Sequence, residues 1–533
     1  MAAATARARR PHVLCFLLLV MVMPCAISAA DLASDGRGRL YQVAMDQAAR
    51  ALAEARAARR DDPRDGVARR GAAQAWADCD QLVEFAVGHL NRTVAAAARG
   101  VDGDDVAAWL SAARTTVGTC LDGFGELGAS PGPEFAAALA NVSRLVTDAL
   151  AATALRRGTE NGARAATNSG DGDGRMLPLD MTRPGDADVV VAKDGTGHFC
   201  TVGEALKAAA RRATNGGGRT VVYVKAGVYN ENVEVWTTNL VLVGDGIGRT
   251  VITGSRSVRG GYTTFSSATF GTPRSSLSLL ASCECECVTL TWMDVHEAVN
   301  ADGFVACGVT FRNAAGAGSG QAVALRASGD RVAFYRCSFE GHQDTLYAHT
   351  LRQFYRECAV AGTVDFVFGN AAAVLQRCSI RVRRPPLPGQ PAVVTAQGRV
   401  DRYERTGFAI HGGRVTAAAR FGAPGAAASA PFEAYLGRPW KEFSRVVYME
   451  AYMDATVGAA GWLAWDGTAF AQSTAFYGEY RNSGPGSGTE GRVRWGGYHV
   501  ITDPGVAAEF TAGEMVNAGE WLGSTGVPFT PGL

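Results

Sequence analysis

Arg331–Phe339 has the sequence RVAFYRCSF, and three similar runs follow it: Gln353–Val360 (QFYRECAV), Val364–Phe368 (VDFVF) and Ala373–Val382 (AVLQRCSIRV). Each run is rich in β-branched and aromatic residues, which is typical of strands buried on both faces. Glycine, Asn and Asp interrupt the runs about every twenty residues. Short strands at a steady period predict a solenoid of stacked coils.

The same texture extends outward on both sides of this stretch. Further runs of this kind are Val189–Val191, Val221–Val224, Leu240–Val243, Val305–Phe311 and Ser444–Met449. Only Val202–Arg212 has a convincing helical pattern within this part of the chain. We therefore predict a mainly β domain over residues 188–533, a parallel β-helix, with a β-sandwich as the alternative.

The chain before residue 188 has a different character. Apolar residues of segment 31–157 recur at helical spacing, as in Leu82, Phe85, Ala86 and Leu90, which predicts a helical bundle. Residues 158–187 are rich in Gly, Asn, Asp and Pro without a period, so they are interpreted as a linker.

Residues 1–30 have the pattern of a secretory signal peptide. Three arginines precede the apolar run Val13–Met23, and Ser28-Ala29-Ala30 offers small residues for cleavage. A membrane anchor is the alternative, but the run is shorter than the ~20 residues of a membrane span. We expect a secreted, extracellular protein with no membrane association, in which disulfides are allowed.

Composition excludes several classes of function. A net charge of +1 over 533 residues gives no support to nucleic-acid binding. The alternating run Cys283–Cys287 lacks the ligand spacing of a zinc site, and no metal or cofactor is expected. The serine-centred elbow of ordinary esterases is absent. Asn91 and Asn141 begin glycosylation sequons, so a glycoprotein is expected.

Two acids lie in unusually apolar surroundings. Asp344 belongs to Gly341–Tyr347 (GHQDTLY), and Asp365 opens Asp365–Asn370 (DFVFGN) about twenty residues later. Because an unpaired buried carboxylate is costly, each acid must be paired, hydrogen-bonded or functional. Two of them one solenoid period apart predict a carboxylate pair with split roles, one ionised and one protonated.

These two segments stand among motifs that occur in a fixed order. The others are Val190–Gly195, Gly227–Glu231, Gly244–Gly246, Thr250–Gly254, Gln321–Leu325, Leu436–Trp440, Tyr477–Tyr480, Gly519–Leu522 and Pro528-Phe529. Together they resemble plant pectin methylesterases that carry an N-terminal inhibitor-like domain. The resemblance implies a right-handed parallel β-helix that hydrolyses methyl esters of pectin in the plant cell wall. It implies a monomer, with separate inhibitor proteins as further partners.

The resemblance also assigns catalytic roles. Asp365 is the expected nucleophile, and Asp344 is the expected proton donor and later base. Gln343 and Gln321 are the expected amide donors to the oxyanion. Arg438 is expected to keep Asp365 ionised and oriented, although a purely structural ion pair is the alternative.

Further site residues follow from the same resemblance. Trp440 and Trp462 are expected to stack on sugar rings, with Tyr347 and Phe368 in the same groove and Thr264 as a substrate contact. Phe366 is expected in the core. Two disulfides are expected, Cys358–Cys378 and Cys79–Cys120, and the latter cysteines are also the only two of the bundle segment.

The chain departs from the family pattern in two places. The inhibitor-like bundle lacks the opening helical hairpin, so a truncated bundle is expected. Residues 271–297 interrupt the catalytic domain, either as a surface loop or as a translated intron. The insertion motivates an alternative function, a catalytically impaired protein that binds pectin. An inhibitor protein acting through the helical domain is a further alternative, and the missing hairpin argues against it. A pectin-cleaving lyase or hydrolase is less consistent with the acid pair and the amide donors.

Overall fold

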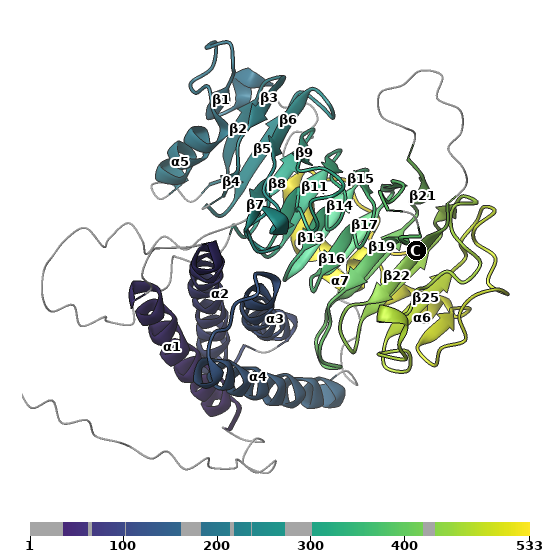
Figure 1. The fold of residues 1–533 in the computed structure, drawn as a ribbon, viewed down its shortest axis with the longest axis horizontal. Helices are drawn as coiled ribbons and strands as arrows, with labels where there is room; N and C mark the ends of the chain where they lie inside the picture. Colours follow the sequence, from purple (N-terminus) through teal and green to yellow (C-terminus); the bar gives the residue numbers. More distant parts are fainter. Residues whose placement is uncertain are drawn as a thin grey trace, which may run out of the picture.

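The computed structural model describes residues 36–61, 67–101, 103–160, 183–213, 218–235, 237–271, 301–387, 389–418 and 432–533. A bundle of long helices lies beside an elongated stack of parallel strands (Figure 1). The predicted signal peptide, nearly all of the 271–297 insertion and most of the predicted linker fall outside the described residues.

Four helices form the bundle. They are α1 (Arg37–Asp61), α2 (Val67–Ala98), α3 (Asp104–Glu126) and α4 (Pro133–Glu160). Each helix packs on the next and α1 packs on α4, so the four enclose one apolar core around residues such as Leu82, Leu110 and Val146. The helical bundle predicted from the sequence is therefore present in the described residues as four helices.

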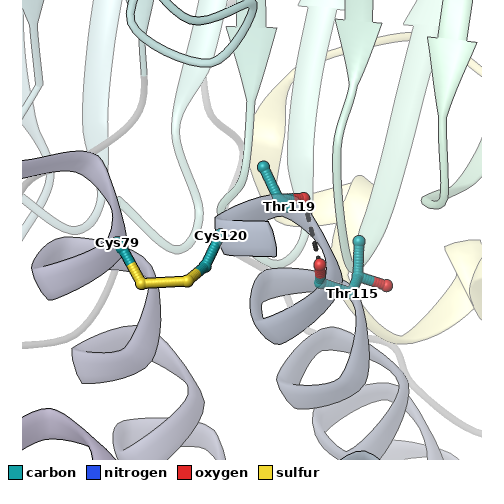
Figure 2. Close-up of a disulfide and its surroundings, with 4 residues drawn as sticks. All are labelled: Cys79, Thr115, Thr119 and Cys120. Carbon is teal, nitrogen blue, oxygen red and sulfur yellow. Dashed lines mark hydrogen bonds between the residues drawn. A yellow bond between two sulfur atoms is a disulfide. The ribbon is translucent and has the colours of Figure 1, made fainter. Parts of the chain in front are cut away.

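A disulfide joins α2 to α3. Cys79 and Cys120 are buried and bonded to each other, as predicted from the sequence. Figure 2 shows the bond one residue from Thr119, whose hydroxyl donates to the carbonyl of Thr115 one turn earlier at 3.0 Å. The link fixes the C-terminal half of α3 against its neighbour, and this half of α3 contacts the solenoid.

Three parallel sheets form the walls of the solenoid within the described residues. The eleven-stranded sheet contains, in spatial order, β1 (Val189–Val191), β2 (Thr220–Val224), β5 (Leu240–Gly244), β8 (Val305–Cys307), β11 (Val332–Tyr335), β14 (Arg352–Arg356), β17 (Ala372–Gln376), β20 (Gly407–His411), β23 (Arg445–Met449), β25 (Phe476–Tyr480) and β26 (Tyr498–Val500). The eight-stranded sheet contains β3 (Gly227–Asn230), β6 (Thr250–Gly254), β9 (Thr310–Asn313), β12 (Ser338–Glu340), β15 (Ala359–Gly362), β18 (Ser379–Val382), β21 (Arg414–Ala417) and β24 (Tyr452–Met453). The seven-stranded sheet contains β4 (Val233–Glu234), β7 (Phe270–Gly271), β10 (Leu325–Ala327), β13 (Leu346–Ala348), β16 (Val367–Gly369), β19 (Ala392–Gln397) and β22 (Ala434–Pro439). The predicted right-handed parallel β-helix is confirmed.

Like residues stack on like residues inside the solenoid. Because strands pair in parallel, Phe334 of β11 lies in register with Tyr355 of β14, and their rings stack at 5.1 Å. Phe311 and Phe339 stack at 5.9 Å in the neighbouring sheet. Such aromatic pairs bury large apolar areas and hold each coil to the next. The repeated sequence runs are therefore the repeated layers of one core.

Shorter helices cover the end and one side of the solenoid. The helix predicted at Val202–Arg212 is present as α5 (Val202–Ala213), and it packs on β1 and β2 at the N-terminal end. Helices α6 (Pro504–Ala508), α7 (Ala512–Val516) and α8 (Ala518–Trp521) follow β26, and α7 packs against β14 and β17. The seven-stranded sheet instead faces the bundle.

The predicted Cys358–Cys378 disulfide is not formed in this structure. Both residues are buried free thiols, and Cys337 precedes them at the same corner of the previous coil. The Cys358 Sγ donates to the carbonyl of Phe334, and the Cys378 Sγ donates to that of Tyr355, both at 3.4 Å. Each thiol thus bonds to backbone of the preceding coil, and no disulfide joins the two cysteines.

One helical segment among the described residues is long and apolar enough to cross a bilayer by length and composition. It is Pro133–Leu155, within α4. Its apolar residues Leu139, Val142 and Val146 are fully buried in the bundle core. Its apolar composition is therefore explained by its packing in the core of the bundle.

Candidate active site

A row of outward-facing residues crosses the seven-stranded sheet. Tyr347 pairs with Phe368, Phe368 with Ala396, and Ala396 with Arg438 on successive strands. Side chains alternate along a strand, so the neighbouring Leu346 and Val367 point into the solenoid core. The row therefore faces away from that core. The Tyr347 and Phe368 rings stack at 4.2 Å. The row forms an aromatic floor that ends at a guanidinium.

The two predicted acids lie at equivalent corners of adjacent coils. Asp344 immediately precedes Thr345 and β13, Asp365 precedes Phe366 and β16, and the Asp344 N–H donates to the Val364 carbonyl at 3.1 Å. Both acids have left-handed backbones, with φ of 60° and 50°. Asp tolerates this region better than most residues, and such conformations cluster at functional sites. Phe366 is fully buried in the core, as predicted.

Arg438 holds Asp365 through a two-pronged ion pair. Its Nε donates to Oδ1 at 2.9 Å, and its Nη2 donates to Oδ2 at 2.6 Å. Burial raises the pKa of Asp365, whereas the hydrogen bonds and charge of Arg438 lower it. This geometry fixes the plane of the carboxylate and favours its ionised form.

Asp344 has no such cation bonded to it. Burial raises its pKa well above the usual value, and the charge of nearby Asp365 raises it further. Arg438 acts on Asp344 only through its charge. The two acids therefore have different environments. Burial raises the pKa of both, but only Asp365 has a bound cation that opposes the shift and favours its ionised form.

The two acids line a pocket of about 460 Å³. The sequence-predicted residues that the structure brings to it are Thr264, Gln321, Gln343, Asp344, Tyr347, Asp365, Phe368, Arg438 and Trp440. The Thr264 hydroxyl is buried in the pocket wall, where its residue faces the Glu126 carboxyl of α3. Within the described residues, no cluster of His, Cys, Asp and Glu could hold a metal ion.

Trp462 is the one predicted sugar contact that the structure does not bring to the pocket. Its side chain is 1% exposed, stacks on Tyr477 at 4.1 Å, and donates from Nε1 to Glu479 at 3.4 Å. Trp465, three residues later, lines the pocket, and its ring lies 4.5 Å from Cζ of Arg438. Sequence reasoning missed Trp465, although a second indole beside the first was a visible signal.

The helical bundle supplies the opposite wall of the pocket. Residues of α3 line it, among them Thr119, Asp122 and Glu126. The Thr119 hydroxyl hydrogen-bonds His349 Nε2 at 3.0 Å, and Glu126 Oε2 accepts from the Thr264 N–H at 2.6 Å. Burial raises the pKa of Glu126 to about 7. The C-terminal half of α3 therefore lies over the two acids.

Comparison with known proteins now decides the family. A family model described as Pectinesterase matches residues 188–280 and 278–519, more than half of the chain. The chain belongs to the pectinesterase family. A second model, Plant invertase/pectin methylesterase inhibitor, matches residues 28–152. The enzyme is thus a carboxylic ester hydrolase that acts on the methyl esters of pectin, joined to an inhibitor-like domain.

Individual relatives agree with this assignment. The chain is 44% identical to Pectinesterase 2 of Citrus sinensis over 464 residues, which are 86% of this chain and 82% of the citrus protein. It is also 44% identical over 461 residues to Probable pectinesterase/pectinesterase inhibitor 17 of Arabidopsis thaliana, covering 86% and 81% of the two chains. A solved pectin methylesterase from carrot is 41% identical with a TM-score of 0.56, covering 69% of this chain and all of the carrot chain. Nothing in these comparisons supports the alternative of a catalytically impaired pectin-binding protein.

Replacing Trp465 with Ala tests the reassigned tryptophan. We expect the kcat/KM of this pectinesterase for methylated pectin to fall roughly tenfold, because the Arg438 guanidinium loses a cation–π contact of ~1 kcal/mol and the pocket loses an aromatic wall. Methanol release is measured on the released esterase. To obtain it, the full chain is folded intact and cut at a protease site introduced between residues 161 and 182, and the esterase is then separated from the bundle.

Trp462→Phe is the matched control for that experiment. It should lower the free energy of unfolding by about 1–3 kcal/mol, as buried large-to-small changes do, and leave KM near its original value. Denaturant unfolding measures the first quantity and methanol release the second. If KM changed in Trp462→Phe but not in Trp465→Ala, the original prediction of Trp462 as a sugar contact would be restored.

Proposed function

We propose that this pectinesterase hydrolyses the methyl ester with Asp365 as nucleophile and Asp344 as the acid and base. The observation that carries the proposal is the two-pronged ion pair between Arg438 and Asp365, beside an acid that lacks one. An ionised carboxylate held in a fixed orientation is suited to nucleophilic attack. A neutral carboxyl group next to it is suited to protonating a leaving group.

The reaction then proceeds in two halves. An Asp365 oxygen attacks the ester carbonyl, the resulting intermediate collapses, and methoxide leaves with the Asp344 proton as methanol. The product of this half is an anhydride between Asp365 and the galacturonate carbonyl. Ionised Asp344 next takes a proton from water, the hydroxide attacks the anhydride, and the free galacturonate and the Asp365 carboxylate are regenerated.

The remaining pocket residues stabilise the developing negative charge and bind the sugar rings. We assign the Gln321 and Gln343 amides as donors to the oxyanion of each intermediate. The aromatic floor of Tyr347 and Phe368, with Trp440 beside it, suits the apolar face of a pyranose ring. Once α3 has left, the Thr264 hydroxyl suits a hydroxyl or carboxyl oxygen of the polymer.

We further propose that the inhibitor-like domain restrains the esterase within the same chain. Helix α3 lines the catalytic pocket, so substrate and helix exclude each other. Ion pairs also join the two domains: Asp122 with Lys441, Asp105 with Arg331 and Arg352, Asp104 with Arg405, and Arg92 with Asp302. Secretion to the plant cell wall, removal of the signal peptide and inhibition by separate inhibitor proteins belong to the same proposal, supported by plant relatives with both domains.

The test of the catalytic proposal measures two products together. The released esterase should liberate methanol and titratable acid in equal amounts from methylated pectin, because ester hydrolysis yields one of each. A lyase would produce an unsaturated sugar without methanol, and a binding protein would release neither. Either of these outcomes would overturn the proposal.

The restraint should weaken as pH rises. Burial raises the pKa of Glu126 to about 7 from an ordinary value of 4.5, and burial also raises those of Asp78 and Asp344. Asp122 and Asp78 add to the shift at Glu126 by charge repulsion. A carboxyl group whose pKa is higher in the docked state than in the undocked state favours docking. This contribution is complete at pH values below the undocked pKa, and it is lost as the pH rises through the docked pKa.

We therefore expect the activity ratio of released esterase to intact chain to fall between pH 5 and pH 8, roughly through the ~7 of docked Glu126. Methanol release from both forms at each pH measures the ratio. Glu126→Gln, which keeps an acceptor for the Thr264 N–H, should flatten the dependence in part. A ratio that stays constant over this range would contradict the expected coupling.

A further inference from the structure

Helix α3 presents two carboxylates to the cleft, one turn apart. Asp122 and Glu126 are four residues apart and so share a helix face. Glu126 accepts from the Thr264 N–H, and both oxygens of Asp122 accept from Lys441 Nζ, at 3.1 and 3.3 Å. Both acids line the catalytic pocket. The helix thus places carboxylates at points where the esterase offers hydrogen-bond donors.

Lys441 has no part in the catalytic proposal. It directly follows Trp440, and its Nζ lies 4.9 Å from the centroid of the Trp440 ring. Its side chain is 30% exposed even with the bundle in place. Among the described residues, Asp122 is the only carboxylate paired with it. When the bundle leaves, this ammonium stands at the edge of the pocket beside an aromatic ring.

The chemistry of the polymer supplies a replacement for Asp122. Each turnover converts a neutral methyl ester into a carboxylate, so partly hydrolysed pectin carries free carboxylates beside the remaining esters. A galacturonate ring that contacts the Trp440 indole would bring its carboxyl group within reach of Lys441. An ammonium attracts a carboxylate and gains nothing comparable from an ester.

We propose that Lys441 is a binding position for the free carboxylate of an unesterified galacturonate, and that Asp122 of the inhibitor-like domain occupies this position in the intact chain. The proposal rests on the proposed function, because it places the sugar chain across the same pocket. It makes Lys441 a specificity-determining residue. The esterase would prefer esters that neighbour a carboxylate it has already produced, and its own product would compete for the site.

The experiment compares two substrates on the released esterase. They are a fully methylated oligogalacturonate and one of the same length that is half de-esterified. The quantity measured is kcat/KM for the half de-esterified substrate divided by kcat/KM for the fully methylated one. Lys441→Gln should lower this ratio by about tenfold, because the variant loses one partly screened charge-assisted hydrogen bond. The inhibition constant of an unesterified oligogalacturonate should rise by a similar factor. Lys441→Arg should retain most of the preference, and high salt should reduce it in the unaltered enzyme.

Arg405→Gln is the matched control. Arg405 also pairs with α3, through Asp104 at 2.6 Å, but it does not line the catalytic pocket. In the released esterase this variant should leave the substrate ratio unchanged. In the intact chain both Asp122→Asn and Arg405→Gln should raise basal activity, since each removes an ion pair between the domains.

The outcomes distinguish a failure of the carboxylate position at Lys441 from a failure of the catalytic proposal. No methanol from the unaltered released esterase would overturn the catalytic proposal, whatever Lys441 does. An active enzyme whose ratio and inhibition constant are the same in Lys441→Gln would overturn the carboxylate position alone. A ratio that changes equally in Arg405→Gln would show a general charge effect and would likewise overturn it.

Discussion

Asp365→Asn should abolish methanol release from methylated pectin, with kcat reduced by at least about 10⁴-fold, the scale on which enzymes lose activity when a nucleophile is removed. The amide keeps the size of the carboxylate but cannot form the anhydride with the substrate. It also leaves the Arg438 guanidinium without its ionic partner. The measurement is methanol release by the released esterase at saturating substrate.

A second buried aspartate provides the control. Asp330 accepts from Arg352 Nε at 2.9 Å and also pairs with Nη2, much as Asp365 pairs with Arg438, but it lies outside the pocket. Asp330→Asn should lower the free energy of unfolding by about 3 kcal/mol, the cost of breaking a buried ion pair, with kcat largely retained. If Asp365→Asn kept kcat within tenfold of the unaltered enzyme, Asp365 would not be the nucleophile.

Cutting the chain between its two domains and removing the bundle should raise esterase activity at pH 5 by at least about tenfold. The intact chain can bind substrate only in the fraction of molecules whose bundle has left the pocket, and apparent affinity falls by that fraction. Thr119, Asp122 and Glu126 all lie in the pocket wall, so partial access is not expected. Methanol release is compared for intact, cut and separated protein.

The cut but unseparated sample is the internal control for this prediction. It should retain part of the restraint, because the inter-domain ion pairs remain in place, and should become active on dilution or at higher salt. Equal activity in all three samples would show that the docked bundle does not restrain the esterase. In that case α3 would be a structural contact only.

Most of the fold was predictable because a solenoid repeats one local pattern. The runs around Val332–Tyr335, Arg352–Arg356 and Ala372–Gln376 each carry the composition of a buried strand, and their even spacing predicts parallel stacking. The acid pair was visible for the same reason. A period of about twenty residues places equivalent positions of adjacent coils side by side, so Asp344 and Asp365 had to be neighbours.

The errors have a common physical cause. Trp462 and Trp465 differ by three residues in an irregular segment, where no periodicity says which side chain faces inward. The Cys358–Cys378 pair was expected from resemblance, but the orientation of each thiol depends on the backbone carbonyl behind it. Local sequence does not fix the direction of a side chain outside a regular strand or helix.

The sequence alone indicated the two-domain organisation and favoured the parallel stacking of coils, because each depends on patterns that repeat. The family resemblance of its contiguous motifs named the expected residues of the pocket. Only the tertiary structure decided that α3 covers the pocket, that Glu126 and Asp122 meet Thr264 and Lys441, and that Trp465 and not Trp462 lines the pocket. These contacts join residues up to several hundred positions apart. They depend on how two separately folded surfaces meet, and that information is not carried by the periodicity of either one.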